Sequence, residues 1–390
     1  RAMLHAENSY YIPNIKIIGN VWLTNIPPNT AFRGFGAPQG ILNIENIIEK
    51  VSRILKKDVA EIQYINFYGN KDRNTTPFGQ LVQNNRIYVI WDKIMESSDY
   101  KNRRKQIDEF NKNNEYRKRG LALTPVKFGI SFTTAFLNQA GALVHVYQDG
   151  TVLVNHGGTE MGQGLNTKMQ RIAALEFGID FDKVKVNATN TSKVPNASAT
   201  AASTGADLNG MAVKDAVEKI KKNIADVIAA EFNKLNNDNL SKPENIIFEN
   251  NFIIDKNDSQ RKIEFTKAMF LVRFNRKSLS SSGYYSTPGV EFDRAKGIGT
   301  PFFYFAYGIS VSEVEVDLLT GKIELLRTDI LHDVGDSINK DIDIGQVEGA
   351  FVQGMGWAIM EDQKYDIKGK NITSSCLLYT SPSPRDRTRS

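Results

Sequence analysis

The sequence has very little cysteine and histidine, the residue types that most often bind transition metals. Its 390 residues include one cysteine, Cys376, and four histidines. A single cysteine excludes a disulfide within the chain, and also any zinc or iron–sulfur site that needs several thiolates. The chain therefore offers no metal-ligand cluster of its own, since no metal-ligand spacing relates the histidines, His5, His145, His156 and His332.

Long hydrophobic runs are also missing. No stretch approaches the roughly 18 apolar residues of a membrane span. The first residues, Arg1 to His5, lack the apolar core of a signal peptide, and the absence of an initial methionine indicates that the record begins inside a longer protein. Hydrophobic residues make up 41% and charged residues 24% of the chain, which is typical of a globular protein. We expect a cytoplasmic protein of two or three domains, with no membrane partner.

Charge is unevenly distributed. The net charge is +5, but residues 101–119 alone carry +5 and residues 385–390 carry +2, so the rest of the chain is slightly acidic at −2. The run at 101–119 is either a nucleic-acid patch or a solvated, partly helical linker. No nucleic-acid motif accompanies it. We favour the linker and predict no nucleic-acid partner.

Periodicity predicts a mixture of helices and strands. Apolar residues at helical spacing predict a helix over 38–55, and Asp58 is a good cap for a second one. Two β-rich runs at 142–147 and 151–154 flank Asp149-Gly150 and predict a hairpin. The elements do not alternate strictly, which indicates the α+β class. Further helices are expected at 163–177, 208–235 and 343–361, and further strands at 302–317 and 322–332.

Two C-terminal features stand apart. The helix over 343–361 contains four glycines, each costing about 1 kcal/mol relative to alanine, which suggests close packing or close approach of a ligand. Residues 376–390 have no periodicity and resemble translated sequencing-adaptor read-through, although a natural disordered tail is the alternative. We exclude this tail from the fold.

Three loops are unusually rich in glycine and small polar residues: Thr30–Gln39, Asn155–Leu165 and Ala199–Gly205. The second follows a strand and opens a helix, so its backbone N–H groups suit an anion such as phosphate, unless the loop is only a tight turn. It lacks the spacing of a Walker loop or of a dinucleotide fingerprint. In the first loop, Phe35 stands between two glycines, which gives its ring room to face a planar ligand.

Together these loops resemble the molybdenum-cofactor-binding region of the xanthine dehydrogenase and aldehyde oxidase family, the molybdenum hydroxylases. The order and spacing of the motifs agree over about residues 1–370, with xanthine dehydrogenases the better match. The matching motifs are Arg33-Gly34-Phe35-Gly36, Gly157–Gly164, Thr200–Ser203, Asp343–Phe351, Lys127–Thr133 and Phe136–Ala142.

The resemblance implies an α+β fold of mixed-sheet and helix molybdopterin-binding domains, truncated at both ends. It divides the chain into the C-terminal part of a first molybdopterin-binding domain at 1–95, a charged linker at 96–120, a truncated second domain at 121–375, and a tail at 376–390 that is not native. Molybdopterin holds molybdenum through its own dithiolene, which agrees with the scarcity of cysteine and histidine.

The resemblance also implies roles for individual residues. Arg33 lies beside the molybdenum centre as a catalytic residue, and Arg33 and Ala202 form part of the surroundings of the metal. Phe35 and Phe132 sandwich a flat heterocycle, a use that suits aromatic faces, and Thr133 contacts the substrate. The residues expected to bind the cofactor are Met161, Gln163, Ala201, Ala202, Ser203, Thr204, Gly205 and Gln346.

Arg1 decides the expected substrate. It matches an arginine that is typical of xanthine dehydrogenases and that stabilises charge developing on a purine. We therefore expect hydroxylation of hypoxanthine or xanthine to urate, with water as the oxygen source, in purine catabolism. An aldehyde oxidase and a non-catalytic scaffold relative are the alternatives. Asn166, where the family often has histidine, is interpreted as neutral.

Parts of the family pattern are missing. The catalytic glutamate lies in a Val-Gly-Glu-Pro motif that this sequence does not contain. The Phe-Gly-Gly-Lys loop, a second substrate glutamate and the [2Fe–2S] and FAD domains are missing too. In the family, electrons pass through those domains to NAD or oxygen, and the full-length enzymes are homodimers. We expect this chain alone to be inactive.

Overall fold

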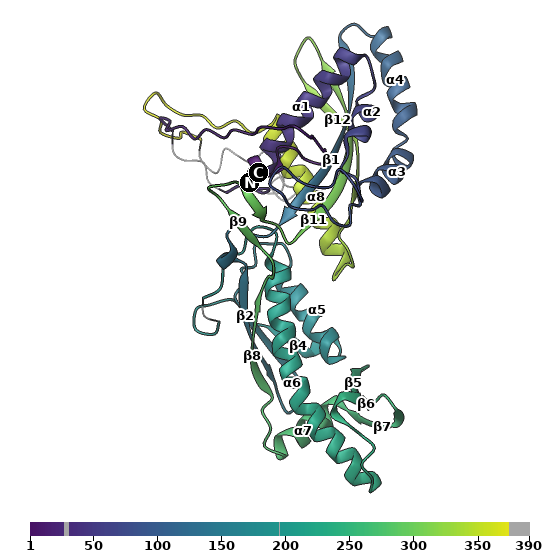
Figure 1. The fold of residues 1–390 in the computed structure, drawn as a ribbon, viewed down its shortest axis with the longest axis vertical. Helices are drawn as coiled ribbons and strands as arrows, with labels where there is room; N and C mark the ends of the chain where they lie inside the picture. Colours follow the sequence, from purple (N-terminus) through teal and green to yellow (C-terminus); the bar gives the residue numbers. More distant parts are fainter. Residues whose placement is uncertain (27–30, 195, 374–390) are drawn as a thin grey trace, which may run out of the picture. The chain divides into compact units, whose positions relative to one another are not determined.

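The computed structural model describes residues 1–26, 31–194 and 196–373, and these form two compact units. Unit 1 comprises residues 1–129, 304–335 and the chain from residue 343 on, whereas unit 2 comprises residues 130–303 and 336–342. The predicted tail at 376–390, with Cys376, lies outside the described residues. The mixture of helices and sheets agrees with the predicted α+β class (Figure 1).

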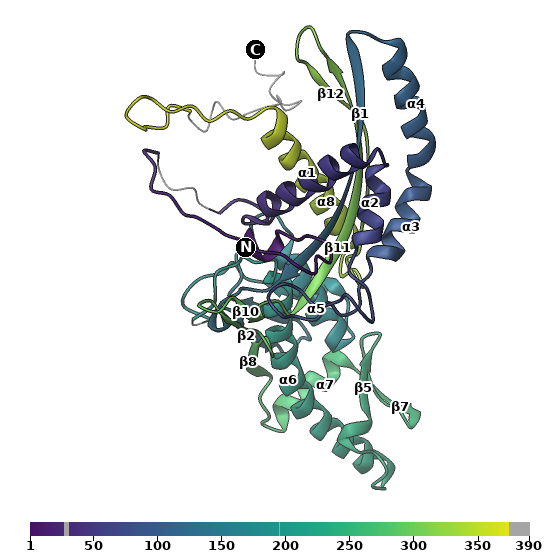
Figure 2. The same cartoon turned by 45° about the horizontal axis from the view of Figure 1, so that its top comes forward.

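Unit 1 is built on a sheet with the strand order β1-β11-β12. The strands are β1 (Arg117–Ile130), β11 (Tyr304–Asp317) and β12 (Ile323–His332). The last two confirm the predicted pair of long strands, which pair antiparallel over nearly their whole length. Helices α3 (Ile87–Ser97) and α4 (Tyr100–Asn113) lie along one face of this sheet (Figure 2).

The two helices predicted near the N-terminus are confirmed. α1 (Ala37–Leu55) begins after Gly36 and buries Ile44 and Ile48, while α2 (Val59–Asn66) begins after Asp58. The Asp58 carboxylate accepts a hydrogen bond from the Ala60 N–H at 2.8 Å, and this satisfies one of the backbone donors that a helix start leaves unpaired. The cluster that these helices cover combines aliphatic residues with six aromatic ones, which are Tyr10, Phe67, Tyr68, Trp91, Tyr100 and Tyr307.

The segment 96–120 is partly helical, as predicted, but it is part of unit 1 and not a separate linker. This segment contains α4 and the start of β1, and its Tyr100, Arg103 and Ile107 are buried. Arg103 donates to Glu313 at 2.9 Å and to Asp329 at 2.7 Å. Because these carboxylates lie on β11 and β12, about 200 residues further on, the local charge pattern could not reveal that the helix packs on the sheet.

Buried charge also connects the N-terminal segment to β1. The Lys127 Nζ lies 3.1 Å from the Glu7 carboxylate, and the two side chains are 1% and 0% exposed. The Asn8 amide donates to the Pro125 carbonyl at 2.6 Å and to the Glu45 carboxylate at 2.7 Å. Paired in this way, the buried ions avoid the cost of an isolated buried charge.

Unit 2 is built on a second sheet, with the strand order β4-β3-β2-β8. Antiparallel β2 (Gln139–Val146) and β3 (Val152–His156) confirm the predicted hairpin. The flanking strands are β4 (Val184–Val186) and β8 (Ser280–Ser286), and the helices against the sheet are α5 (Leu165–Phe177) and α6 (Gly205–Asn236).

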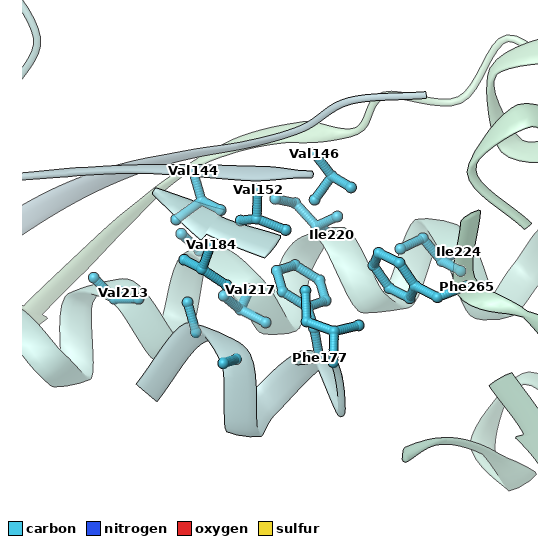
Figure 3. Packing of buried hydrophobic residues seen from close by; sticks show 14 of the residues in the cluster. Val144, Val146, Val152, Phe177, Val184, Val213, Val217, Ile220, Ile224 and Phe265 are labelled. Carbon is cyan, nitrogen blue, oxygen red and sulfur yellow. The ribbon is translucent and has the colours of Figure 1, made fainter. Parts of the chain in front are cut away.

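The core of unit 2 is aliphatic (Figure 3). Valines of β2, β3 and β4 pack against α5 and α6 because alternate strand residues point to one face of the sheet. The predicted apolar stripe of α6 is confirmed, since all of its members are buried; these are Ala212, Val213, Ala216, Val217, Ile220 and Ile224.

A smaller sheet of unit 2 has the order β5-β6-β7. Its strands are β5 (Ile246–Glu249), β6 (Phe252–Asp255) and β7 (Asp258–Glu264), and α7 (Phe265–Phe274) follows. A separate ribbon pairs β9 (Glu291–Asp293) with β10 (Ile298–Thr300). Short 3-10 turns complete the described elements at Met3–His5, Ala135–Leu137, Phe181–Lys183 and Pro243–Asn245.

The predicted glycine-containing helix is α8 (Lys340–Ile359). Close packing of its glycines is not found within the described residues. A Cβ added at Gly345, Gly349 or Gly354 would meet no described atom within 4 Å, and at Gly356 it would meet only the Glu361 carboxylate. Among the described helices, including α8, none is both long enough and apolar enough to cross a membrane.

Candidate functional site

The loop before α1 has a strained backbone that exposes an aromatic ring. Gly34, Phe35 and Gly36 have φ angles of 91°, 50° and 94°. Positive φ costs glycine little, but it is a genuine outlier for a bulky residue such as phenylalanine. The Phe35 side chain is 60% exposed. Strain of this kind concentrates at functional sites, and the exposure of Phe35 shows that it is not a core residue.

The first residues of the chain pack against the start of α1. A Cβ at Gly36 would lie 3.4 Å from the Ala2 nitrogen and 3.8 Å from the Arg1 Cβ, and a Cβ at Gly40 would collide with the Ala2 carbonyl oxygen. Only glycine permits this approach. Arg1 and the Phe35 loop, which are remote in sequence, therefore lie side by side in unit 1.

Arg1 is fixed at the end of β1. Its Nη1 donates to the Gly129 carbonyl at 2.5 Å, and its guanidinium lies 5.5 Å from the centre of the Phe128 ring. The Gly129 N–H donates to His5 Nε2 at 3.0 Å, so His5 carries its proton on Nδ1 and donates to the Arg1 carbonyl, also at 3.0 Å. Burial lowers the pKa of Arg1 to about 10, which leaves it charged at neutral pH.

Arg33 and Gln346 meet in unit 1 although 312 residues separate them in the sequence. Arg33 Nη2 donates to the Gln346 side-chain oxygen at 2.9 Å and to its backbone carbonyl at 3.1 Å. The sequence assigns both residues to the cofactor surroundings, and the structure brings this pair together. The ring of Phe32, the residue before Arg33, lies 5.3 Å from the Trp357 ring of the same helix as Gln346.

In unit 2, the loop before α5 uses its own backbone N–H groups internally, which favours the tight-turn interpretation over an anion on these groups. The Glu160 carboxylate accepts hydrogen bonds from the backbone N–H groups of Gly162, Gly164 and Asn166 at 2.9, 3.0 and 2.9 Å. Partial burial opposes ionisation of Glu160, but these backbone hydrogen bonds lower its pKa. The helix start is thus neutralised by a carboxylate of the chain itself, a role that could have been inferred from an acid shortly before a helix.

The same loop uses its glutamine internally. Gln163 Oε1 accepts from the Met161 N–H at 2.5 Å, and its Nε2 donates to the Thr159 carbonyl at 2.8 Å. The Met161 side chain is 66% exposed. The Thr159 N–H donates to Thr200 Oγ1 at 2.8 Å. This bond joins the glycine loop to the loop before α6, so two predicted cofactor loops lie together.

The loop before α6 turns through two left-handed residues. Ala202 and Ser203 have φ angles of 56° and 60°. The Thr204 hydroxyl donates to the Ala201 carbonyl at 3.0 Å, and α6 begins at Gly205 with no side-chain hydrogen bond to its first turn. In the part of the chain that the structure describes, the side chain of the N-cap residue Thr204 thus makes no capping bond to α6, whereas Glu160 bonds to the start of α5.

His156 fixes the glycine loop to α5. Its Nδ1 accepts from the Gly158 N–H at 3.1 Å, so Nε2 carries the proton and donates to the Asn166 side-chain oxygen at 2.9 Å. Burial lowers the pKa of His156, and the imidazole is neutral in this arrangement. Asn166, interpreted from sequence as neutral, has a definite structural role as the acceptor.

The remaining predicted substrate residues, Phe132 and Thr133, lie in the loop between β1 and β2, and both are partly exposed. The backbone of this loop is held by Asn138, a residue that sequence reasoning did not single out. Within the described residues, no group of three or more histidine, cysteine or acidic side chains could hold a metal ion. Of the predicted site residues, Arg1, Arg33, Phe35 and Gln346 belong to unit 1, and all others belong to unit 2.

Two sequence-family models match most of the chain. A family described as "Molybdopterin cofactor-binding domain" matches residues 93–387, and a second family with the same description matches residues 1–67. The chain is 46% identical over 389 residues to a xanthine dehydrogenase of Dictyostelium discoideum and 44% identical over 382 residues to a xanthine dehydrogenase/oxidase of Gallus gallus. These two alignments include 99% and 98% of this chain, but only 26% of the length of each relative.

Solved structures share the fold. The quinoline 2-oxidoreductase of Pseudomonas putida 86 aligns with a TM-score of 0.78 over 91% of this chain and 44% of its own, at 20% identity. The aldehyde oxidoreductase of Desulfovibrio desulfuricans aligns with a TM-score of 0.76 over 93% of this chain and 35% of its own, at 24% identity. At these identities the likeness concerns the fold alone.

Proposed function

The chain belongs to the molybdopterin cofactor-binding domains of the xanthine dehydrogenase family, and on this premise we propose that the full-length protein hydroxylates a purine. Hypoxanthine and xanthine are the proposed substrates, urate is the product and water supplies the oxygen. The observation that carries this proposal is identity of 43–46% to xanthine dehydrogenases over nearly the whole chain. The chain spans about a quarter of the length of those relatives.

The residues present fit a cofactor that brings its own metal ligands. The described residues lack a metal-ligand cluster, but they offer small side chains and a left-handed backbone in the Ala201–Gly205 loop, at the start of α6. An uncapped helix start suits the anionic groups of a pterin cofactor. The bound molybdenum–molybdopterin group would supply the two-electron redox chemistry. We assign its binding to Met161, Gln163, Ala201–Gly205 and Gln346, with Arg33 and Ala202 nearest the metal.

Arg1 gives the chain its preference for a purine over an aldehyde. It is a cation at neutral pH, fixed by Gly129 and His5, and it therefore stabilises negative charge that develops on the heterocycle during hydroxylation. A simple aldehyde develops no charge on a ring. Phe35 and Phe132 contact the flat faces of the substrate, and Thr133 forms a polar contact.

Arg33 orients Gln346. Its two hydrogen bonds fix both the side chain and the backbone of this glutamine. Groups that are fixed in advance cost no reorganisation when charge develops.

Electron transfer and assembly are assigned to parts outside this chain. We propose [2Fe–2S] and FAD domains that pass electrons to NAD or oxygen, a homodimeric full-length protein and a cytoplasmic location. The catalytic glutamate of the family is missing from the 390 residues, so the chain expressed alone should not turn over purines.

Turnover by the full-length protein tests the proposal. We expect urate from hypoxanthine, with oxygen derived from labelled water, and much weaker oxidation of aldehydes. Arg1→Met should reduce purine turnover by several orders of magnitude while aldehyde oxidation persists. Preferential oxidation of aldehydes would instead identify an aldehyde oxidase. Stoichiometric molybdenum without either activity would identify a non-catalytic relative.

A further inference from the structure

Asn138 makes an unusual contact with the loop that carries Phe132 and Thr133. The side chain is 1% exposed. Its Oδ1 accepts from the Phe132 N–H at 2.8 Å, and its Nδ2 donates to the Phe132 carbonyl at 2.8 Å and weakly to the Thr134 carbonyl at 3.3 Å. One amide thus satisfies both backbone groups of Phe132, as a neighbouring strand would do.

Asn138 is itself fixed within unit 2. It immediately precedes β2, its carbonyl accepts from the Thr287 N–H at 2.9 Å, and its N–H donates to the Ala135 carbonyl at 3.0 Å. β2 pairs with β8 over the aliphatic core. The amide that holds Phe132 is therefore anchored directly before a strand of the main sheet of unit 2.

The other end of the loop is held by Ser131. This residue is 1% exposed and has a φ of 150°, which is unusual for any residue except glycine. Its hydroxyl donates to the Pro301 carbonyl at 2.9 Å and accepts from the Phe303 N–H at 3.2 Å. With both ends fixed, the position of the Phe132 ring depends on the Asn138 amide more than on packing, because the ring is partly exposed.

We propose that Asn138 is a positioning residue for substrate, acting through the backbone of Phe132. This inference rests on the proposed function, in which Phe132 and Thr133 contact the heterocycle. Without the amide, the Phe132 N–H and carbonyl lose their shared partner and the ring samples other orientations. A displacement of about 1 Å at a reacting group can lower a rate about 100-fold.

The chain offers a matched control at the far end of α6. The Asn233 Nδ2 donates to the Ser241 carbonyl at 2.9 Å, and its Oδ1 accepts from the Ser241 N–H at 2.8 Å. This is the same two-bond contact on a residue that has no assigned role in substrate binding. Asn138→Ala and Asn233→Ala therefore remove equivalent hydrogen bonds from the same unit.

The test uses the full-length protein with its cofactors. We expect both alanine variants to lower the melting temperature by a few degrees and to retain molybdenum. Only Asn138→Ala should lower kcat/KM for hypoxanthine by about 100-fold, with KM raised. Asn138→Asp keeps the acceptor for the Phe132 N–H but cannot donate to its carbonyl, so its kcat/KM should fall between those of Asn138→Ala and wild type.

The outcomes separate this inference from the function on which it rests. A molybdenum-loaded wild type that makes no urate contradicts the proposed function. If wild type makes urate but Asn138→Ala stays within about twofold of Asn233→Ala in kcat/KM, the positioning role is refuted. Should Asn138→Ala fail to fold, Asn138→Asp decides, and wild-type kinetics in this variant would overturn the proposal.

Discussion

The two units hold their functional loops with different interactions. Unit 1 relies on buried charges and imidazole, such as Lys127 with Glu7 and His5 with Arg1. Unit 2 surrounds its loops with an aliphatic core and holds them by neutral groups, as at Asn138, Thr200 and His156, and by the exposed Glu160 carboxylate. Buried ions are costly when one partner is lost, whereas neutral hydrogen bonds contribute about 1 kcal/mol each. Unit 1 should therefore be the more sensitive to substitution and acid.

The buried ion pair should give the largest effect. Lys127→Met leaves the Glu7 carboxylate buried without its counter-ion, so we expect the free energy of unfolding of unit 1 to fall by about 3–5 kcal/mol. The three tryptophans, Trp22, Trp91 and Trp357, all belong to unit 1, so tryptophan fluorescence during urea unfolding of the 390-residue chain reports on this unit.

Removing both charges should restore most of this loss. The control, Lys127→Met combined with Glu7→Leu, replaces the pair by apolar side chains of similar volume, a change that is often neutral. A double variant as unstable as Lys127→Met would show that the loss reflects packing and not an unpaired charge.

Acid should give the next largest effect. Burial, followed by the charge of Lys127, lowers the pKa of His5 from its ordinary 6.5 to about 3. Between these values the unfolded chain binds a proton that the folded chain does not, so stability present above pH 6.5 is lost as the pH falls towards 3. Between pH 7 and pH 5, this protonation lowers the free energy of unfolding by about 2 kcal/mol.

His5→Gln isolates that effect. Glutamine offers a donor and an acceptor for Arg1 and Gly129 but does not titrate, so the variant should lose about 2 kcal/mol less than wild type between pH 7 and pH 5. Fluorescence-detected urea unfolding at both pH values measures the difference. Parallel pH profiles would assign the acid sensitivity to other groups.

The helix cap of unit 2 should have a smaller effect. Glu160→Ala removes the acceptor for three backbone N–H groups before α5, and we expect a loss of about 1 kcal/mol. Circular dichroism during urea unfolding checks this value. A loss as large as that of Lys127→Met would remove the contrast between the units.

The exposed pair of unit 1 should have the smallest effect on stability. Arg33 contacts Gln346 at the surface, so Arg33→Ala should change the free energy of unfolding by less than about 0.5 kcal/mol. Purine turnover by the full-length protein should nevertheless be largely lost. A strongly destabilised variant would indicate that Arg33 is mainly structural.

Local patterns predicted the helices and strands well. The α6 stripe and the Asp58 cap depend only on nearby residues, and both are confirmed. The path of the chain between units could not be predicted in this way, because unit 1 depends on β11 and β12 lying beside β1 and α4. Arg103 illustrates the difference: its charge suggested solvent, but its partners are remote carboxylates.

The site was only partly predictable for a related reason. Motif resemblance indicated Arg33 and Gln346, which the structure brings into contact. It did not indicate that Glu160 occupies the start of α5 or that Asn138 holds Phe132, because both depend on side chains bonding to the backbone. The left-handed backbone of Phe35 is likewise a property of the folded loop.

The central claim is that the loop before α6 holds molybdopterin, and molybdenum content tests it most directly. We predict stoichiometric molybdenum in the full-length protein. Ser203→Asp should lose most of it, because a negative charge then faces an anionic cofactor, while Ser203→Asn should retain it; both residues tolerate the left-handed backbone at this position. Equal molybdenum in the two variants, or none in wild type, would contradict the account.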